Sequence, residues 1–450
     1  MANLFCGAAK AEITPEKELI PNLRALSDKR FGGVFGPLYV RGIAIKNESE
    51  TVLLIALELD KVPYPKEILR ELSEKTGIPE RNILYFSVNT HSAPVTGYRP
   101  FERGNDTTRK SEAVQEATRR YEEAVKTAVF RAVEEAIDGM RPARIGYGTG
   151  KSYINVNSSL DYVTYKDDGT EIHQMGSGDN FEGPVDHTVF VMRMEDTQGV
   201  PIAFLVNYAV HCSVMMWNRC VDGKIGISAD LAGEVSGYME KHYPGAVSVW
   251  SSGAAADVNA LMMTHSTYPN PDTGMVDGYT AVSEEFPAAI LKKLSSLHFA
   301  DILRVAQKIH CTDEEPDIKT GVSWCYVPSY LSRNDVTGIP NVTEQPGGEP
   351  FDIRLQKVEI GGMAFVGVSG ELCTTLGWAV QESARRKTVV IINHNACMLA
   401  HGGRTFDDET YERCSNSAYR KKCLAGMNQF TARPGYIKAA LQQSTEELFG

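Results

Sequence analysis

Two apolar strand patterns that end in histidine constrain this chain most. The first covers residues 84–94 (LYFSVNTHSAP), where an aromatic and β-branched run stops at Asn89 and His91 before a proline. The second covers residues 202–213 (IAFLVNYAVHCS) and ends in His211. Runs bounded in this way are typical of buried strands, and open α/β sheets place their sites at the carboxyl ends of strands. The pair predicts a sheet edge that carries two histidines, although a lone histidine is more often a satisfied core or loop residue.

Other predicted strands end in polar residues that belong to the same edge. These strand ends are Asp60 after 51–59, Asp257 and Asn259 after 246–250, Glu371 after 364–368, and Asn393-His394 after 388–392. The small residues at 251–256 would let a ligand approach the backbone closely. We expect His91, His211 and Glu371 to converge on one pocket, because each follows a strand of one sheet.

Helical patterns alternate with these strands. Residues 66–75 predict a short helix closed by Gly77, which makes a parallel βαβ crossover from 51–59 to 84–88. Residues 111–138 predict a long helix with an apolar core face, stopped by Gly139. Residues 144–182 are rich in Gly, Asn, Ser and Asp with interleaved tyrosines, which predicts an extended lid-like loop. Without repeats or a clear linker, residues 1–450 are expected to form a single α/β domain.

Composition excludes several classes of function. With 42% apolar and 23% charged residues the chain resembles ordinary soluble proteins, and a net charge of −11 argues against a nucleic-acid or anionic-membrane partner. No apolar run is long enough to span a bilayer, and the N-terminus lacks the pattern of a secretory signal. Nine cysteines without CxxC spacing fit reduced thiols. We expect a cytoplasmic protein with a small-molecule substrate and no membrane partner. The oligomeric state stays open, a homo-oligomer included.

The predicted edge suits metal chemistry, although no tight metal motif is present. Two histidines and a carboxylate match the nitrogen and oxygen ligands of zinc, which leaves a position open for a water that attacks an amide or ester carbonyl. The spacing alone is weak evidence, since nothing resembles HExxH.

The order of several short motifs resembles the neutral/alkaline (non-lysosomal) ceramidase-like family, from about Gly7 to at least Glu412. The matching stretches are AAKAEITP (8–15), PLYVR (37–41), THSAP (90–94), GPVD (183–186), NYAVH (207–211), ISAD (227–230), AAADVN (254–259) and SGE (369–371). The resemblance implies mixed β-sheets flanked by helices, a single zinc ion and hydrolysis of an amide such as ceramide. Ceramidases also carry an immunoglobulin-like C-terminal domain, for which this chain is expected to be too short.

The chain departs from the family at its implied zinc ligands. His211 and Glu371 match two ligands, whereas Asn89 stands where the first histidine is expected and His91 matches the second, non-ligating histidine. The ligand tyrosine falls near Leu399. Two further replacements are Ser158 for a lid arginine and Asn259 for a serine. A rebuilt ligand set would draw on His91, His211, Glu371 and His401.

Three interpretations from different classes follow. The first is a hydrolase with a rebuilt metal centre that cleaves an amide or related bond of a small polar, soluble substrate. The second is a metal-free isomerase or lyase with His91 and His211 as acid/base pair, oriented by Asp60, Asp257 or Glu371. The third is an inactive binding homologue that kept the fold.

Site residues are predicted in three roles. The predicted catalytic residues are His91, Asn89, Asp257 and Asn259; the substrate-binding residues are Asp60, Tyr208, His401 and Arg404; and the metal ligands are His211, Glu371 and His91. Arg404 could clamp a substrate carboxylate or phosphate, or it could be a surface arginine paired with Asp407 or Asp408.

Overall fold

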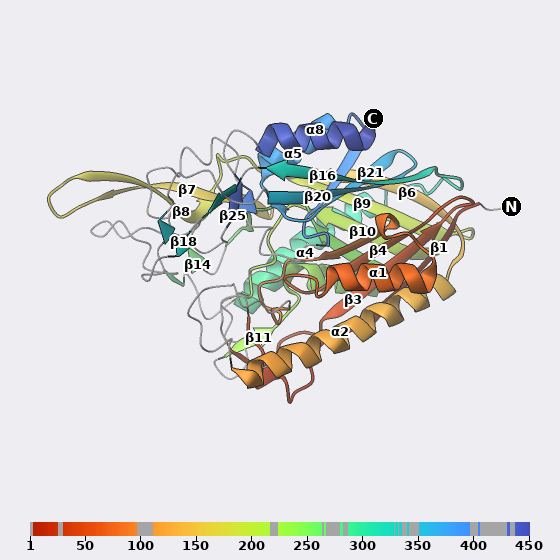
Figure 1. Ribbon diagram of the computed structural model, residues 1–450, viewed down its shortest axis with the longest axis horizontal. Coiled ribbons are helices and arrows are strands. Elements are labelled where there is room, and N and C mark those ends of the chain that lie inside the picture. Colours follow the sequence, from red (N-terminus) through yellow and green to blue (C-terminus); the bar gives the residue numbers. More distant parts are fainter. Residues whose placement is uncertain are drawn as a thin grey trace.

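Strands between Phe5 and Ser252 form an eight-stranded mixed sheet in the order β12-β10-β9-β6-β1-β3-β4-β5 (Figure 1). Their bounds are β1 Phe5–Glu12, β3 Tyr39–Lys46, β4 Thr51–Leu57, β5 Ile83–Ser87, β6 Arg141–Lys151, β9 Thr188–Asp196, β10 Pro201–Tyr208 and β12 Val247–Ser252. The β10–β12 and β4–β5 pairs are parallel, and the other neighbours are antiparallel.

The computed structural model describes most of the chain. The described residues are 3–25, 30–96, 111–216, 224–262, 265–266, 280–281, 287–327, 329–331, 333–334, 340–341, 351–396, 404–405, 430–432 and 437–450. The predicted substrate-binding residue His401 lies outside these residues, as does Leu399, near which the implied ligand tyrosine falls. Arg404 is described only in its backbone.

A four-stranded sheet packs face to face on the eight-stranded one. It runs in the order β16 (Ile318–Val327), β20 (Phe351–Ile360), β21 (Met363–Val368) and β23 (Thr388–Ile392), with only the β21–β23 pair parallel. The apolar layer between the sheets joins Leu54, Phe86 and Met192 of the larger sheet to Phe365 and Ile392 of the smaller one. Both sheets are therefore buried on the faces that meet.

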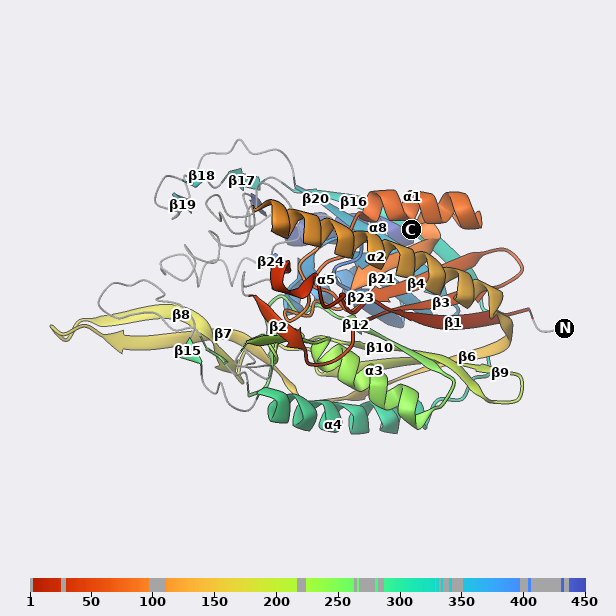
Figure 2. The same cartoon turned by 90° about the horizontal axis from the view of Figure 1, so that it is seen from below.

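Helices cover the two outer faces of this pair of sheets (Figures 1 and 2). On the larger sheet, α1 (Pro65–Thr76) and α2 (Glu112–Asp138) pack over β1, β3, β4 and β5, while α3 (Asp230–His242) and α4 (Pro287–Ala306) pack over β9, β10 and β12. On the smaller sheet lie α5 (Thr374–Ser383) and α8 (Ile437–Phe449). The expected α/β fold of mixed sheets flanked by helices is confirmed.

The helix signals read from the sequence have clear physical counterparts. Ser111 caps α2 by accepting a hydrogen bond from the Val114 N–H, and buried valines at 125, 129 and 133 form the face toward the sheet. Helix α1 ends at Gly77, whose φ of 73° is the left-handed conformation that glycine adopts without strain. Because β4 and β5 pair in parallel on either side of α1, the predicted βαβ crossover is confirmed.

The expected lid-like loop at 144–182 is wrong, because this region is mostly strand. β6 belongs to the large sheet, and β7 (Asn155–Tyr165) and β8 (Glu171–Asn180) form a long hairpin that projects from the body (Figure 2). The glycines of β6 serve packing: a Cβ at Gly150 would lie 2.5 Å from Val305 Cγ2 of α4. Glycine was therefore misread as a loop signal where it permits close approach.

Short ribbons connect these layers. They are β2 (Phe31–Val34) with β11 (Ile225–Ile227), β13 (Val258–Ala260) with β7, β14 (His265–Ser266) with β15 (Thr280–Ala281), β17 (Ser329–Leu331) with β25 (Phe430–Ala432), β18 (Arg333–Asn334) with β19 (Pro340–Asn341), and β22 (Glu371–Leu372) with β24 (Arg404–Thr405). Two of them, β13 and β22, continue into the candidate site.

The stability of the core should depend on the ion pairs of the buried Arg41 guanidinium. Arg41 contacts Glu58 and donates from Nε to Glu240 at 2.8 Å, and its side chain is only 4% exposed. We predict that Arg41→Ala lowers the free energy of unfolding by about 3–5 kcal/mol, because the buried Glu58 carboxylate loses its cation and Glu240, which also pairs with Lys10, loses one of two. Urea denaturation measures this loss. Arg119→Ala, which breaks an exposed pair with Glu116, is the control and should leave the midpoint unchanged. Equal midpoints for both variants would refute the prediction.

His298 on α4 should make the fold sensitive to acid. Its ring is buried against Tyr208, and desolvation lowers its pKa from 6.5 to about 3. An unfolded chain therefore binds a proton that the folded chain excludes, so stability is full above pH 6.5 and falls as the pH drops toward 3. We predict that the wild type loses roughly 2–3 kcal/mol between pH 7 and 4.5 relative to His298→Gln. Parallel pH profiles of unfolding for the two proteins would contradict it.

Candidate functional site

Strand ends from both sheets bring polar side chains together. Asn89 and His91 follow β5, His211 follows β10, Glu371 opens β22 just after β21, and His394 follows β23. Asn89, His211, Glu371 and His394 are all buried. Parallel pairing of β4 with β5 and of β21 with β23 sets the ends of these strands side by side.

Glu371 Oε1 is the centre of this group. It lies 2.8 Å from His211 Nε2 and 3.6 Å from His394 Nε2, and it accepts a hydrogen bond from Asn89 Nδ2 at 3.0 Å. Burial by itself raises the pKa of Glu371, but the charges and hydrogen bonds of His211 and His394 outweigh it and hold the pKa well below its usual range. The carboxylate is therefore stabilised in its charged form, which makes it an anchor for its neighbours.

The orientation of the His211 ring is fixed from its other side. Its Nδ1 lies 2.9 Å from the Val258 carbonyl oxygen, and because a carbonyl only accepts, Nδ1 must carry the proton. In a neutral ring Nε2 then presents a lone pair toward the Glu371 carboxylate. His211 thus links the Val258 carbonyl of β13 to the Glu371 carboxylate of β22.

His91 lies beside this unit. Its ring meets that of His211 edge to face, with centroids 5.4 Å apart and planes at 86°. Its backbone N–H donates to the Cys212 carbonyl at 3.0 Å, which ties the end of β5 to the end of β10. Because His91 is only half-buried, it is the most accessible of the site imidazoles. The three side chains expected to converge, His91, His211 and Glu371, thus lie together.

Asp257 and Asn259 have mainly positioning contacts in this structure. Asp257 Oδ1 accepts from the Thr374 N–H at 2.8 Å and from its hydroxyl at 3.0 Å, and Oδ2 accepts from Asn157 Nδ2 at 3.1 Å. This carboxylate therefore fixes the start of α5 directly after Glu371. Asn259 is a buried residue of β13, paired with Val156.

The predicted substrate-binding residues lie in different parts of the structure. Tyr208 is fully buried, and its hydroxyl donates to the Ser152 carbonyl at 2.9 Å, a position that serves the core rather than the site. Asp60 is buried just beyond β4, where its carbonyl accepts from the Ser87 hydroxyl at 2.7 Å. The backbone of Arg404 pairs with Glu371 in the β22–β24 ribbon, which sets the two residues side by side in the chain trace.

Sequence reasoning missed the segment 393–396 as part of the site. His394 contacts Glu371, and its N–H donates to the Gly370 carbonyl at 2.9 Å. Asn393 donates from its backbone to Ser252, at the end of β12, and Asn395 accepts from the Tyr85 N–H of β5 at 3.0 Å. Asn393-His394 shows the same signal as the other sites, a strand that stops at polar residues, but it was given no role.

Two site residues have a strained backbone. Asn89 and His394 have φ values of 57° and 60°, in the left-handed region that residues other than glycine seldom adopt. Asn89 donates a hydrogen bond to Glu371 Oε1, and His394 contacts the same oxygen. Such strain is commonly found at functional sites, where the surrounding contacts enforce it.

The expected zinc site is not formed by the side chains as they lie. Within the described ranges, no group of three or more His, Cys, Asp and Glu residues is arranged to hold a metal ion. His211 Nε2 and Glu371 Oε1 are 2.8 Å apart, whereas two ligands of one tetrahedral zinc would stand about 3.3 Å apart. Asn89 also donates an N–H to the oxygen that would ligate.

Solved structures of ceramidases have the same fold. Neutral ceramidase from Pseudomonas aeruginosa superposes with a TM-score of 0.70 at 14% identity, over 100% of this chain and 74% of that one. A ceramidase complexed with C2 gives a TM-score of 0.70 at 14% identity, over 100% of this chain and 75% of that one. No protein-family model matches the sequence, and no curated protein is similar to it.

These comparisons confirm the fold expected from the short motifs. At 14% identity the likeness concerns the fold alone. In the part of the chain that is described, no helix has both the length and the apolar character needed to cross a membrane.

The amide of Asn395 should be essential to the stability of the site. It accepts from the Tyr85 N–H and donates to Gln356 Oε1 at 2.9 Å, and it is fully buried. We predict that Asn395→Ala costs about 2–4 kcal/mol in urea unfolding, because the buried Tyr85 N–H loses its partner and Gln356 Oε1 loses one of its two donors. Gln443→Ala, an amide exposed on α8, should change stability by less than about 0.5 kcal/mol. Similar losses for both variants would show that the Asn395 contacts are not special.

Proposed function

We propose that the group around His211 and Glu371 hydrolyses an amide or related bond of a small polar, water-soluble substrate. The observation that carries this proposal is the His211–Glu371 contact, fixed on Val258 and placed beside His91 at the strand ends. The hydrolase-like fold supports hydrolysis, since the structural neighbours are named ceramidases. A net charge of −11 and the polar side chains of the site favour a soluble substrate over a lipid.

His91, His211 with Glu371, and Asn89 have different roles in the proposed hydrolysis. His91 is half-buried and accessible, so it is placed to take a proton from the attacking water. Glu371 holds His211, whose ring meets the edge of His91, so that the two rings keep a fixed relation. Asn89 uses one amide N–H on Glu371 and has a second N–H that can donate to a substrate carbonyl oxygen.

A metal-activated water is the competing route, because the resemblance implies zinc. When bound, a divalent ion would supply an acidified water. The donor set of imidazoles and a carboxylate is chemically suitable, but His211 Nε2 and Glu371 Oε1 contact each other at 2.8 Å, closer than two ligands of one zinc ion would stand. The experiment must therefore separate the two routes.

The test uses a panel of N-acyl amino acids, N-acyl amino sugars and long-chain ceramide. We predict turnover of a polar amide, with kcat reduced at least about 100-fold in His91→Ala and in His211→Ala. His242→Ala, on the exposed end of α3, is the matched control and should keep full activity. EDTA should leave the wild type active, and Asn89→His should raise zinc affinity, measured by calorimetry, by restoring an imidazole.

Each contrary result has a distinct meaning. Loss of activity on chelation, with recovery on adding zinc, would establish the metal route. Turnover of ceramide alone would overturn the polar substrate. Unchanged activity in both histidine variants would place the chemistry elsewhere, and no turnover of any compound would favour a binding homologue.

A further inference from the structure

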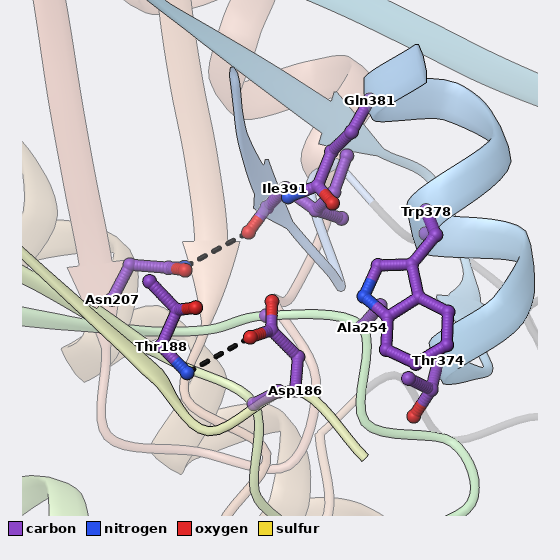
Figure 3. Close-up of a pocket in the computed structure, with 11 residues that line it drawn as sticks. Asp186, Thr188, Asn207, Ala254, Thr374, Trp378, Gln381 and Ile391 are labelled. Carbon is purple, nitrogen blue, oxygen red and sulfur yellow. Dashed lines mark hydrogen bonds between the residues drawn. The ribbon is translucent and has the colours of Figure 1, made fainter. Parts of the chain in front are cut away.

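A hollow lies between α5 and the ends of β9 and β10, and it shares no residue with the His211–Glu371 group. It encloses about 20 Å³, which is room for one water-sized group. Asp186, Asn207, Trp378 and Gln381 line it together with small residues (Figure 3). The proposed hydrolysis does not use these side chains.

Acceptor oxygens dominate this hollow. Figure 3 shows the Asp186 carboxylate pointing into the space between Asn207 and Trp378. Asp186 Oδ1 accepts from the Thr188 N–H at 2.8 Å, and among the described residues no cation lies within ion-pair distance of this carboxylate. Lys151 of β6 donates to the Thr188 hydroxyl at 3.0 Å. The Asp186 charge is therefore left for a ligand.

In the described part of the chain, the amide oxygens of the lining residues Asn207 and Gln381 accept no hydrogen bond. Asn207 Nδ2 donates to Ser251 Oγ at 2.9 Å and to the Ile391 carbonyl at 2.8 Å, so both of its N–H groups are used and Oδ1 is left. Gln381 Nε2 donates to the Val389 carbonyl at 3.1 Å, which likewise leaves Oε1. With Asp186, the hollow offers a carboxylate and two neutral carbonyl oxygens.

Trp378 forms one wall, and its position is fixed by close packing of α5. Its side chain is 43% exposed. At the preceding residue, Gly377, an added Cβ would lie only 2.4 Å from Ala254 Cβ, so α5 sits directly on the loop after β12. The aromatic wall therefore has a fixed relation to the acceptors and offers a surface for the carbon chain of a ligand.

We propose that this hollow binds a primary ammonium group. Such a group has three N–H donors and one positive charge, which match three acceptor oxygens of which one is charged. It is about the size of a water molecule and fits the enclosed volume, while its alkyl chain lies outward along Trp378. The ligand class is a small aliphatic amine, such as an amino alcohol, a diamine or a free amino acid.

The experiment titrates the full chain with methylammonium, ethanolamine and 1,4-diaminobutane by calorimetry and tryptophan fluorescence. We expect saturable binding, at least about tenfold weaker in Asp186→Asn, which keeps the shape and the Thr188 contact but removes the charge. The fluorescence change should disappear in Trp378→Phe. It should persist in Trp324→Phe, the matched control, because Trp324 is 45% exposed on a different element, β16.

Tetramethylammonium separates this site from a simple aromatic contact, since it has the charge but no N–H donor and is too large for the hollow. We expect it not to bind. Absence of amine binding, binding unchanged in Asp186→Asn, or equal binding of tetramethylammonium would each overturn the proposal. None of these outcomes bears on the hydrolysis, because the variants leave His91, His211 and Glu371 intact.

Discussion

The hydrogen bonds of one short segment, 393–396, hold the strand ends of this protein together. Backbone groups that end a buried strand lose their ladder partners and must find others. Asn393 binds the end of β12, His394 binds Gly370, and Ala396 donates to the Tyr85 carbonyl of β5. The segment thus joins strands of both sheets, and the geometry of the site depends on it. The left-handed backbone of His394 is tolerated because these contacts on both sides enforce it.

Two buried charged side chains, Arg41 and Glu371, have different kinds of partner. Arg41 lies between Glu58 and Glu240 on the helix-covered face of the large sheet, where the cation is surrounded by partners and inaccessible. Glu371 is also buried, but its partners are the titratable or polar groups of His211, His394 and Asn89. The first arrangement stabilises the core, whereas the second keeps a carboxylate and imidazoles in contact at the strand ends, beside His91.

This chain shares its fold with solved ceramidase structures. Asn89 stands where the resemblance places a ligating histidine, and here its amide donates to the carboxylate that would bind the metal. His394 brings an imidazole to the same oxygen from a different strand. Because a fold does not fix function, the residues at these strand ends, rather than the architecture, decide what the site can do.

Local patterns in the sequence were sufficient to predict the helices and strands, and many of the residues at the carboxyl ends of the strands. Strand and helix periodicity, Gly77, and the Ser111 cap act within a few residues, so the βαβ crossover and α2 could be predicted, as could the strand ends at His91, His211 and Glu371. The glycines of β6 could not be read, because their role is contact with a helix more than 150 residues later in the chain. Nor could the sequence show that His394 meets Glu371 or that Tyr208 faces the core. Those contacts depend on how the two sheets pack, which only the tertiary structure decides.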